Sequence, residues 1–154
     1  MQVSVFPGKV EYQDNKFDAI LPKIATTEAA GVDVSTPYSF VLKSGETHLL
    51  NTGLIIKAPR EHCILVLPRS GLATKKSVTI ANTPGLIDRD YCGPEDFIKI
   101  ALVNRGSEDV AFERGDRVAQ LLFIKYVSPV WQVQTEPSFS QNISRGGFGS
   151  TGVA

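Results

Sequence analysis

The chain has few of the residues that bind zinc or form disulfides. It contains two cysteines, Cys63 and Cys92, and two histidines, His48 and His62, among its 154 residues. These four residues match no zinc-ligand spacing, and two thiols cannot build a framework of cross-links. We therefore expect both cysteines to be unpaired and the chain to bind no zinc.

Long apolar runs, a targeting segment and an excess of charge of one sign are also missing. The longest aliphatic run covers residues 64–67, whereas a membrane helix needs ~20 apolar residues. The first residues, MQVSVFPGKVEYQ, lack the basic end and apolar stretch of a secretory signal. Sixteen Lys and Arg balance sixteen Asp and Glu, which excludes the basic footprint of a duplex-binding domain. We expect no membrane and no nucleic-acid partner, and a cytoplasmic or other intracellular reducing compartment, the host cytoplasm if the chain is viral.

The composition is that of an ordinary globular protein. Hydrophobic residues make up 42% and charged residues 21% of the chain, unlike the profile of a disordered protein. Its length suits a single core. From residue 136 the sequence turns to Ser, Gly, Asn and Gln, so we predict one domain at 1–135 and a flexible arm at 136–154.

Glycine and proline divide the chain into short segments. Thirteen glycines and nine prolines separate brief apolar runs, which is typical of many strands joined by turns. The pattern predicts an all-β, jelly-roll-like barrel or sandwich with one short helix near Ser70–Lys76. The predicted strands are 2–5, 17–21, 31–35, 38–42, 46–51, 53–58, 63–67, 77–80, 85–88, 97–104, 110–112, 117–127 and 131–134.

The first segment with functional character is PRSGLATKK at 68–76. It places Arg69, Ser70 and Gly71 at a strand-to-helix junction, where unpaired backbone N–H groups favour an anion. This arrangement could hold a phosphate. The alternative is that Ser70 caps the helix while Arg69 is solvated, and the residue types leave both possibilities open.

The second segment, NTPGLIDRDYCG at 82–93, combines a Pro-Gly turn with two carboxylates and an aromatic ring. In an extended backbone Asp88 and Asp90 would share one face, because side chains alternate with a period of two. Paired carboxylates are common in proton transfer and metal chemistry. The alternative is a hairpin tip with solvated aspartates and a half-buried Tyr91.

The third segment is RGGFGSTG at 145–152. Its backbone N–H groups could wrap phosphate oxygens while Phe148 stacks on a planar ligand. It matches neither common glycine-rich phosphate motif, since no strand and helix frame it. A flexible linker is the alternative.

Taken together, these segments resemble the homotrimeric dUTP nucleotidohydrolases, or dUTPases, whose five motifs occur in this order. The resemblance covers nearly the whole chain and favours the functional interpretation of each segment. The matching segments are AAGVDVST at 29–36, PRSGLA at 68–73, NTPGLIDRDYCG at 82–93, GDRVAQLLF at 115–123 and GGFGSTG at 146–152.

The resemblance implies an enzyme that cleaves dUTP to dUMP and pyrophosphate with Mg²⁺, at three sites between the subunits of a homotrimer. This activity would keep uracil out of DNA and supply dUMP for thymidylate synthesis. Asp88 matches the general base that orients a water for in-line attack on the α-phosphorus. Asp33 matches the carboxylate that holds Mg²⁺ through water.

The resemblance also assigns substrate-binding positions. The phosphates would contact Arg69, Ser70 and Gly71 of a neighbouring subunit, and Gln120 of the fourth motif. Tyr91 would lie under the deoxyribose and leave no room for a 2′-hydroxyl. The pyrimidine pocket would be formed by Asn82 and the hairpin through Gly85 and Ile87, and the fifth motif would contribute Arg145, Gly147, Phe148, Gly149, Ser150 and Thr151. Of these, Phe148 would cover the uracil from a third subunit.

The sequence departs from the family pattern at three places. In an ungapped alignment Ile143 occupies the usual arginine position of the fifth motif, and Arg145 falls on a variable position. Cys92 stands where arginine is common, and residues 94–96 lengthen the following hairpin. The difference at Cys92 lies within the third motif and that at 94–96 follows it, and neither alters Asp88 or Tyr91.

Two other functions remain to be distinguished. A dCTP deaminase of the same fold would need a catalytic glutamate in the strand after the third motif, but 97–104 reads FIKIALVN. A catalytically silent relative acting as a binding protein would have lost Asp88 or the tail glycines, and both are present. An additional interaction through residues 94–96 stays open.

Overall fold

The computed structural model describes residues 2–133, which form fourteen strands and one short helix. The six motif residues predicted between 145 and 151, and the predicted domain boundary at 135, lie outside this range. The strands are β1 (Ser4–Pro7), β2 (Lys9–Tyr12), β3 (Asn15–Asp18), β4 (Lys23–Ile24), β5 (Val32–Ser35), β6 (Phe40–Leu42), β7 (Thr47–Asn51), β8 (Leu54–Lys57), β9 (His62–Leu67), β10 (Val78–Ile80), β11 (Gly85–Ile87), β12 (Lys99–Asn104), β13 (Val110–Phe112) and β14 (Arg117–Lys125), and the helix is α1 (Ser70–Lys76).

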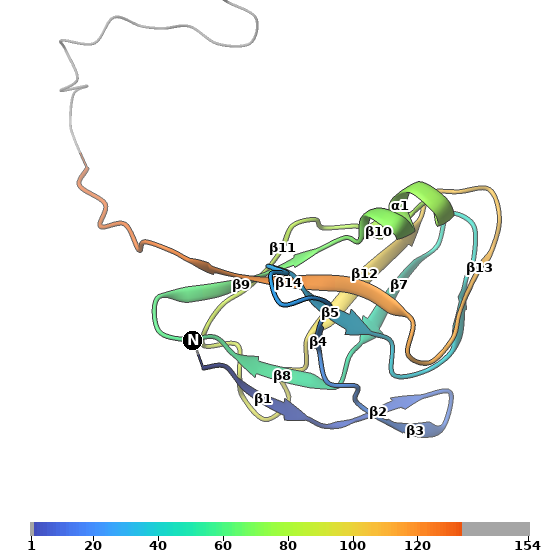
Figure 1. Cartoon of the computed structure of the whole chain (residues 1–154), viewed down its shortest axis with the longest axis horizontal. Coiled ribbons are helices and arrows are strands. Elements are labelled where there is room, and N and C mark those ends of the chain that lie inside the picture. The colour runs from blue at the N-terminus through green and yellow to red at the C-terminus, as the bar shows by residue number, and fades with distance from the viewer. Residues whose placement is uncertain (1, 134–154) are drawn as a thin grey trace, which may run out of the picture.

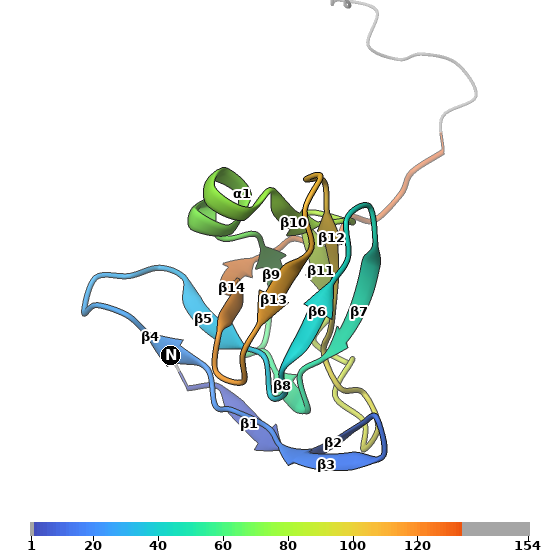
Figure 2. The same cartoon turned by 90° about the vertical axis from the view of Figure 1, so that its right-hand side faces the viewer.

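All strand pairs are antiparallel. The largest sheet has the order β11-β9-β14-β5-β4, and a second sheet has the order β10-β12-β7. Three further pairs, β1–β8, β13–β6 and β2–β3, complete the arrangement. Figure 2 shows β5 and β14 on one side of the molecule and β6 and β7 on the other, with α1 at one end. The prediction of an all-β, jelly-roll-like chain with one short helix is therefore confirmed.

The core lies between these sheets and is mainly aliphatic. Strand β12 illustrates why the strands form, since Ile100, Leu102 and Asn104 are buried while the residues between them are less so. This period of two places one face against the core. Other core residues include Val34, Leu42, Leu50, Leu54, Ile56, Ile64, Ile80, Ile98, Phe112, Val118 and Leu121.

One end of the core is aromatic. Tyr12 stacks on Tyr38 with ring centroids 4.0 Å apart, and Phe40 stacks on His48 at 4.5 Å and on Phe112 at 4.9 Å. The Tyr38 hydroxyl lies 3.3 Å from His48 Nε2. Burial raises the pKa of Tyr38 to about 12 and lowers the pKa of His48 below its ordinary value.

The sequence analysis missed two strands, β2 and β4, and predicted one strand that is not present in residues 131–133. The hairpin of β2 and β3 turns through Gln13 and Asp14, whose φ angles are +48° and +60°. Such turns usually carry glycine, so this one gave no sequence signal. The other missed strand, β4, is two residues long. A strand was predicted at 131–134, but residues 131–133 are not in a strand. The pairing of β14 with β9 ends at Lys125, and residues 131–133 pair with no other described strand.

Among residues 2–133, no helix is long and apolar enough to cross a membrane.

Candidate active site

Sheet register brings three of the motif segments together. Strand β14 lies between β5 and β9, so Gln120 is opposite Asp33 on one side and Leu67 on the other. Two residues after Leu67 comes Arg69. We call Asp33, Arg69, Arg117 and Gln120 the Asp33 cluster; it unites parts of the first, second and fourth motifs.

Two arginines hold the Asp33 carboxylate. Arg69 Nε donates to Asp33 Oδ1 at 2.9 Å, and Arg117 Nη1 donates to Oδ2 at 3.1 Å. The Asp33 side chain is 12% exposed. Since Arg69 uses Nε for this contact, its terminal nitrogens are left for other acceptors.

Arg117 belongs to the Asp33 cluster and lines the same cavity, but the sequence analysis did not predict it as a candidate site residue. In a regular strand Arg117 and Gln120 would point to opposite faces, because they are three residues apart. The register of β14 shifts between Arg117 and Ala119, which places Arg117 opposite Ser35 and Gln120 opposite Asp33. This bulge turns both side chains toward one face. Membership of the fourth motif was the one sequence signal for Arg117.

Gly31 allows the Gln120 amide to take its place. Gln120 Nε2 donates to the Pro68 carbonyl at 3.0 Å. A Cβ on Gly31 would lie 2.4 Å from Gln120 Oε1, too close without moving the amide. The cavity beside this cluster measures about 380 Å³ and is lined by residues including Gly31, Asp33, Arg69, Ser70, Gly71, Arg117 and Gln120.

Helix α1 begins at this cavity. Its N-cap is Arg69 in extended backbone, with no side-chain cap, and Ser70 is the first helical residue. The alternative that Ser70 caps the helix is therefore wrong. Gly71 is exposed, and a Cβ added there would meet nothing within 4 Å. Glycine costs a helix about 1 kcal/mol relative to alanine. Since a side chain at position 71 would meet no neighbour, packing within the chain does not explain why glycine stands there.

The other predicted site residues lie between β10 and the loop after β11, with Gly85 and Ile87 in β11 itself. Asn82 is exposed and lies near Gly85, which is buried opposite Val66 of β9. Ile87 ends β11 and packs partly against the core. Asp88 lies just beyond this strand, contrary to the predicted strand end at residue 88.

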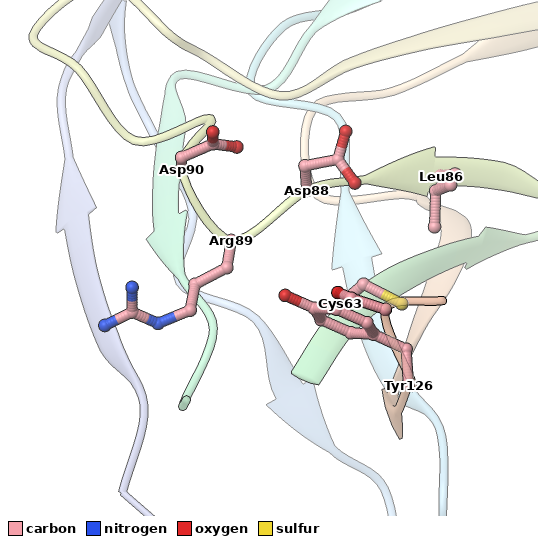
Figure 3. A pocket seen from close by; sticks show the side chains of 7 residues that line it. Cys63, Leu86, Asp88, Arg89, Asp90 and Tyr126 are labelled. Atoms are coloured by element: carbon pink, nitrogen blue, oxygen red, sulfur yellow. The ribbon is translucent and has the colours of Figure 1, made fainter. Parts of the chain in front are cut away.

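A tight loop carries Asp88 and Tyr91. Residues 89 and 90 form a turn rather than extended backbone, and the Tyr91 N–H donates to the Asp88 carbonyl at 3.2 Å. Figure 3 shows the Asp88 and Asp90 carboxylates on one side of the loop and Arg89 on the other. We call residues 88–91 the Asp88 loop. It borders a cavity of about 640 Å³ lined by Cys63, Leu86, Asp88, Arg89, Asp90, Tyr126 and Ser128.

Large side chains are exposed at the Asp88 loop and in the strand before it. Leu86 of β11 is 60% exposed, and Tyr91 of the loop is 38% exposed. Within the part of the chain that the structure describes, the buried Nε of Arg89 has no hydrogen-bond partner. An unsatisfied buried donor costs about 1–3 kcal/mol. The loop and the end of β11 thus combine exposed apolar surface with one polar group that is unpaired within the described residues.

The two groups of site residues lie at opposite ends of β9. Ile87 pairs with Ile64, so Asp88 is level with the start of the strand, whereas Arg69 comes two residues after its end. About six residues separate these levels, or ~20 Å at ~3.3 Å per residue. A single chain therefore does not bring the Asp88 carboxylate to the Asp33 cluster.

A metal site built from protein ligands alone is absent from residues 2–133, where no group of three or more His, Cys, Asp or Glu side chains could hold an ion. Asp33 is the carboxylate in the smaller cavity, and each of its oxygens accepts one bond from arginine. Each oxygen keeps a second acceptor position. This donor set suits a hydrated ion and not a dehydrated one.

Comparison with known proteins points to one family. A family model described as dUTPase matches residues 18–152. The deoxyuridine 5′-triphosphate nucleotidohydrolase of Rickettsia felis is 40% identical over 147 residues, covering 94% of this chain and 96% of its own. That of Rickettsia typhi is 39% identical over 153 residues, covering 98% and 100%.

Solved structures show the same fold. The dUTPase of Staphylococcus bacteriophage 80alpha with dUpNHpp has a TM-score of 0.78 at 22% identity, covering 99% of both chains. The Streptococcus mutans dUTPase has a TM-score of 0.68 at 26% identity, covering 80% of this chain and 99% of its own. A mutant dUTPase from phage phi11 of S. aureus, described with a structural Mg(II) ion, has a TM-score of 0.73 at 20% identity, covering 90% and 100%.

Proposed function

Because the chain belongs to the dUTPase family, we propose that it hydrolyses dUTP to dUMP and pyrophosphate at sites shared between the subunits of a homotrimer. The observation that carries this proposal is the division of the site residues into two groups ~20 Å apart along β9. In a trimer, the Asp88 loop of one subunit meets the Asp33 cluster of its neighbour. The reaction removes dUTP, which keeps uracil out of DNA, and supplies dUMP for thymidylate synthesis.

The Asp33 cluster binds the triphosphate. Asp33 fixes Arg69 through Nε, so the terminal nitrogens of the guanidinium can donate to phosphate oxygens. Ser70 and Gly71 add donors from the start of α1, and the bare Cα of Gly71 lets a phosphate approach the backbone. Gln120 donates through Nε2 to Pro68 and lies at the wall of the same cavity.

The Asp88 loop supplies the base and the nucleoside pocket. Asp88 accepts a proton from the water that attacks the α-phosphorus, and the bond to the leaving pyrophosphate breaks on the opposite side. Asn82 and the backbone between Gly85 and Ile87 hydrogen-bond uracil, and Tyr91 packs under the deoxyribose. A wrong exocyclic group would leave buried donors unpaired, which discriminates strongly between bases.

Magnesium fits the residues that are present. Mg²⁺ keeps several waters and is usually held by one or two carboxylates together with substrate phosphates. Asp33 retains one acceptor position on each oxygen beside its two arginine contacts, so it would hold the hydrated ion through water. When bound, the ion neutralises charge on the phosphates.

Exposed apolar surface supports the assembly. Residues 127–133 leave the body of the domain after β14 (Figure 1). Along this segment Val127 is 89%, Trp131 85% and Val133 91% exposed. A separate apolar groove of about 340 Å³ is lined by residues including Val5, Ile24 and Phe123. Apolar surface of this extent commonly marks a protein interface.

The decisive experiment measures pyrophosphate release by the purified protein from dUTP, dCTP, dTTP and UTP, with and without Mg²⁺. We expect rapid release from dUTP alone and dependence on the ion. Ammonia release from dCTP would identify a deaminase instead. Light scattering should give three chains of 16.7 kDa, and an active monomer would contradict shared sites.

A further inference from the structure

The turn that follows the Asp88 loop is closed by a carboxylate. Asp96 Oδ2 accepts a hydrogen bond from the Gly93 N–H at 2.6 Å, while the Asp96 N–H donates to the Gly93 carbonyl at 3.2 Å. A Cβ on Gly93 would lie 2.9 Å from the same carboxylate oxygen. These reciprocal bonds fix the shape of residues 93–96, which lie in the connection between β11 and β12.

Phe97, the residue after this turn, is fixed by contacts of its own ring and of the next residue. The Phe97 ring lies over Gly8, where a Cβ would be 2.7 Å from Phe97 Cε1. The next residue, Ile98, is 1% exposed, and its N–H donates to the Leu54 carbonyl at 2.8 Å. Phe97 is thereby anchored to the core and to the N-terminal strands.

Tyr91 is attached to this anchored point. Its hydroxyl donates to the Phe97 carbonyl at 3.3 Å. Tyr91 is 38% exposed, so packing within one chain covers it only in part. The hydroxyl bond and the turn that Asp96 closes therefore add to the contacts that hold the ring in place.

We propose that Asp96 is a positioning residue for sugar discrimination, acting through Phe97 on Tyr91. This inference rests on the proposed function, in which Tyr91 excludes a ribose 2′-hydroxyl. Exclusion by contact requires the ring to stay in one place, since a shift of about 1 Å can change rates by ~10²-fold. Opening the turn would leave Phe97 anchored but would loosen the segment between Tyr91 and Phe97, so the Tyr91 ring could retreat from the sugar.

The test compares dUTP with UTP. We expect Asp96→Ala to lower the ratio of kcat/KM for dUTP over UTP by about tenfold and to tighten inhibition by UTP, with kcat for dUTP changed less than about twofold. Asp96→Asn should preserve the ratio, because its amide oxygen can still accept from Gly93. Tyr91→Phe should lose discrimination as Asp96→Ala does, and the double variant should lose little more.

Two controls separate positioning from loss of charge. Glu95→Ala removes a carboxylate from the same turn. Asp109→Ala removes a carboxylate that accepts from the Ser44 N–H at 2.9 Å in a different loop. Both should keep the wild-type ratio.

The outcomes are distinct. If Asp96→Ala hydrolyses dUTP with undiminished discrimination, the positioning role is overturned while the proposed function stands. If Asp96→Ala does not fold, an unchanged ratio for Tyr91→Phe overturns the role instead. Absence of dUTP hydrolysis by the wild-type protein would defeat the proposed function itself.

Discussion

The Asp33 cluster and the Asp88 loop are built in opposite ways. Asp33 lies in a strand paired on both sides, is 12% exposed, and has an arginine on each oxygen. Asp88 lies in an exposed loop, next to Arg89, whose Nε has no hydrogen-bond partner within residues 2–133. The first group is brought together by sheet register within one chain, whereas the proposed function completes the second with a neighbouring subunit.

This difference predicts which substitutions affect folding and which affect activity. Removing one partner from a buried ion pair leaves an uncompensated charge in the protein. Replacing an exposed carboxylate usually has little effect on the free energy of unfolding. Substitutions in the Asp33 cluster should therefore alter stability as well as turnover, and those in the Asp88 loop turnover alone.

The largest effect is expected for Asp88→Asn. The amide is nearly isosteric but cannot accept the proton of the attacking water, so turnover should fall ~10²–10⁴-fold. Binding of a non-hydrolysable dUTP analogue and the urea midpoint should be unchanged. Asp90→Asn, in the same loop, is the matched control and should retain most of its turnover. Near-normal turnover of Asp88→Asn would exclude it as the base.

The next effect is expected for Asp33→Asn. Loss of the charge leaves Arg69 and Arg117 without their carboxylate, which should lower the free energy of unfolding by about 1–3 kcal/mol. Phosphate binding should weaken as well, because Arg69 loses its anchor. The control is Asp18→Asn, which removes an exposed ion pair in which Lys9 Nζ lies 3.8 Å from Asp18 Oδ1. Equal urea midpoints for the two variants would show that burial of Asp33 has no energetic consequence.

Two glycines of the same cavity should respond in opposite directions. Gly71→Ala points into open space, so it should stabilise α1 by up to about 1 kcal/mol and yet reduce activity by blocking the phosphate. Gly31→Ala pushes against Gln120 Oε1 at 2.4 Å and should lower both stability and activity. Thermal melts with parallel dUTP assays check this pair. A fully active Gly71→Ala would remove that residue from the phosphate site.

The smallest effect lies away from both groups, at His48. Desolvation lowers its pKa in the folded state, with Glu46 opposing more weakly. The unfolded state therefore binds the proton more readily, and its ordinary pKa is about 6.5. The contribution of neutral His48 to the free energy of unfolding should be fully present above this pH. It should decrease as the pH falls through this value toward the lower pKa of the folded state. Urea unfolding between pH 8 and 5 should show this loss, and His48→Gln should flatten it.

Local sequence patterns were sufficient for most of the fold. Alternating burial in β12 and the limits of α1 follow from residues a few positions apart, so they could be predicted. The hairpin at Gln13 and Asp14 was missed because its positive φ angles occur without glycine. The predicted strand at 131–134 failed over residues 131–133 because a strand needs a partner, and pairing is not a local property.

The sequence alone determined the residue types of the site. The motifs predict Asp33, Arg69, Gln120 and Asp88 as site residues, since the chemistry of phosphate transfer demands particular side chains. Tertiary structure decided how they are combined. Register across β14 and its bulge brought Arg117 to Asp33, and the length of β9 kept Asp88 apart. Both depend on hydrogen bonds between strands that are distant along the chain, which no local pattern specifies.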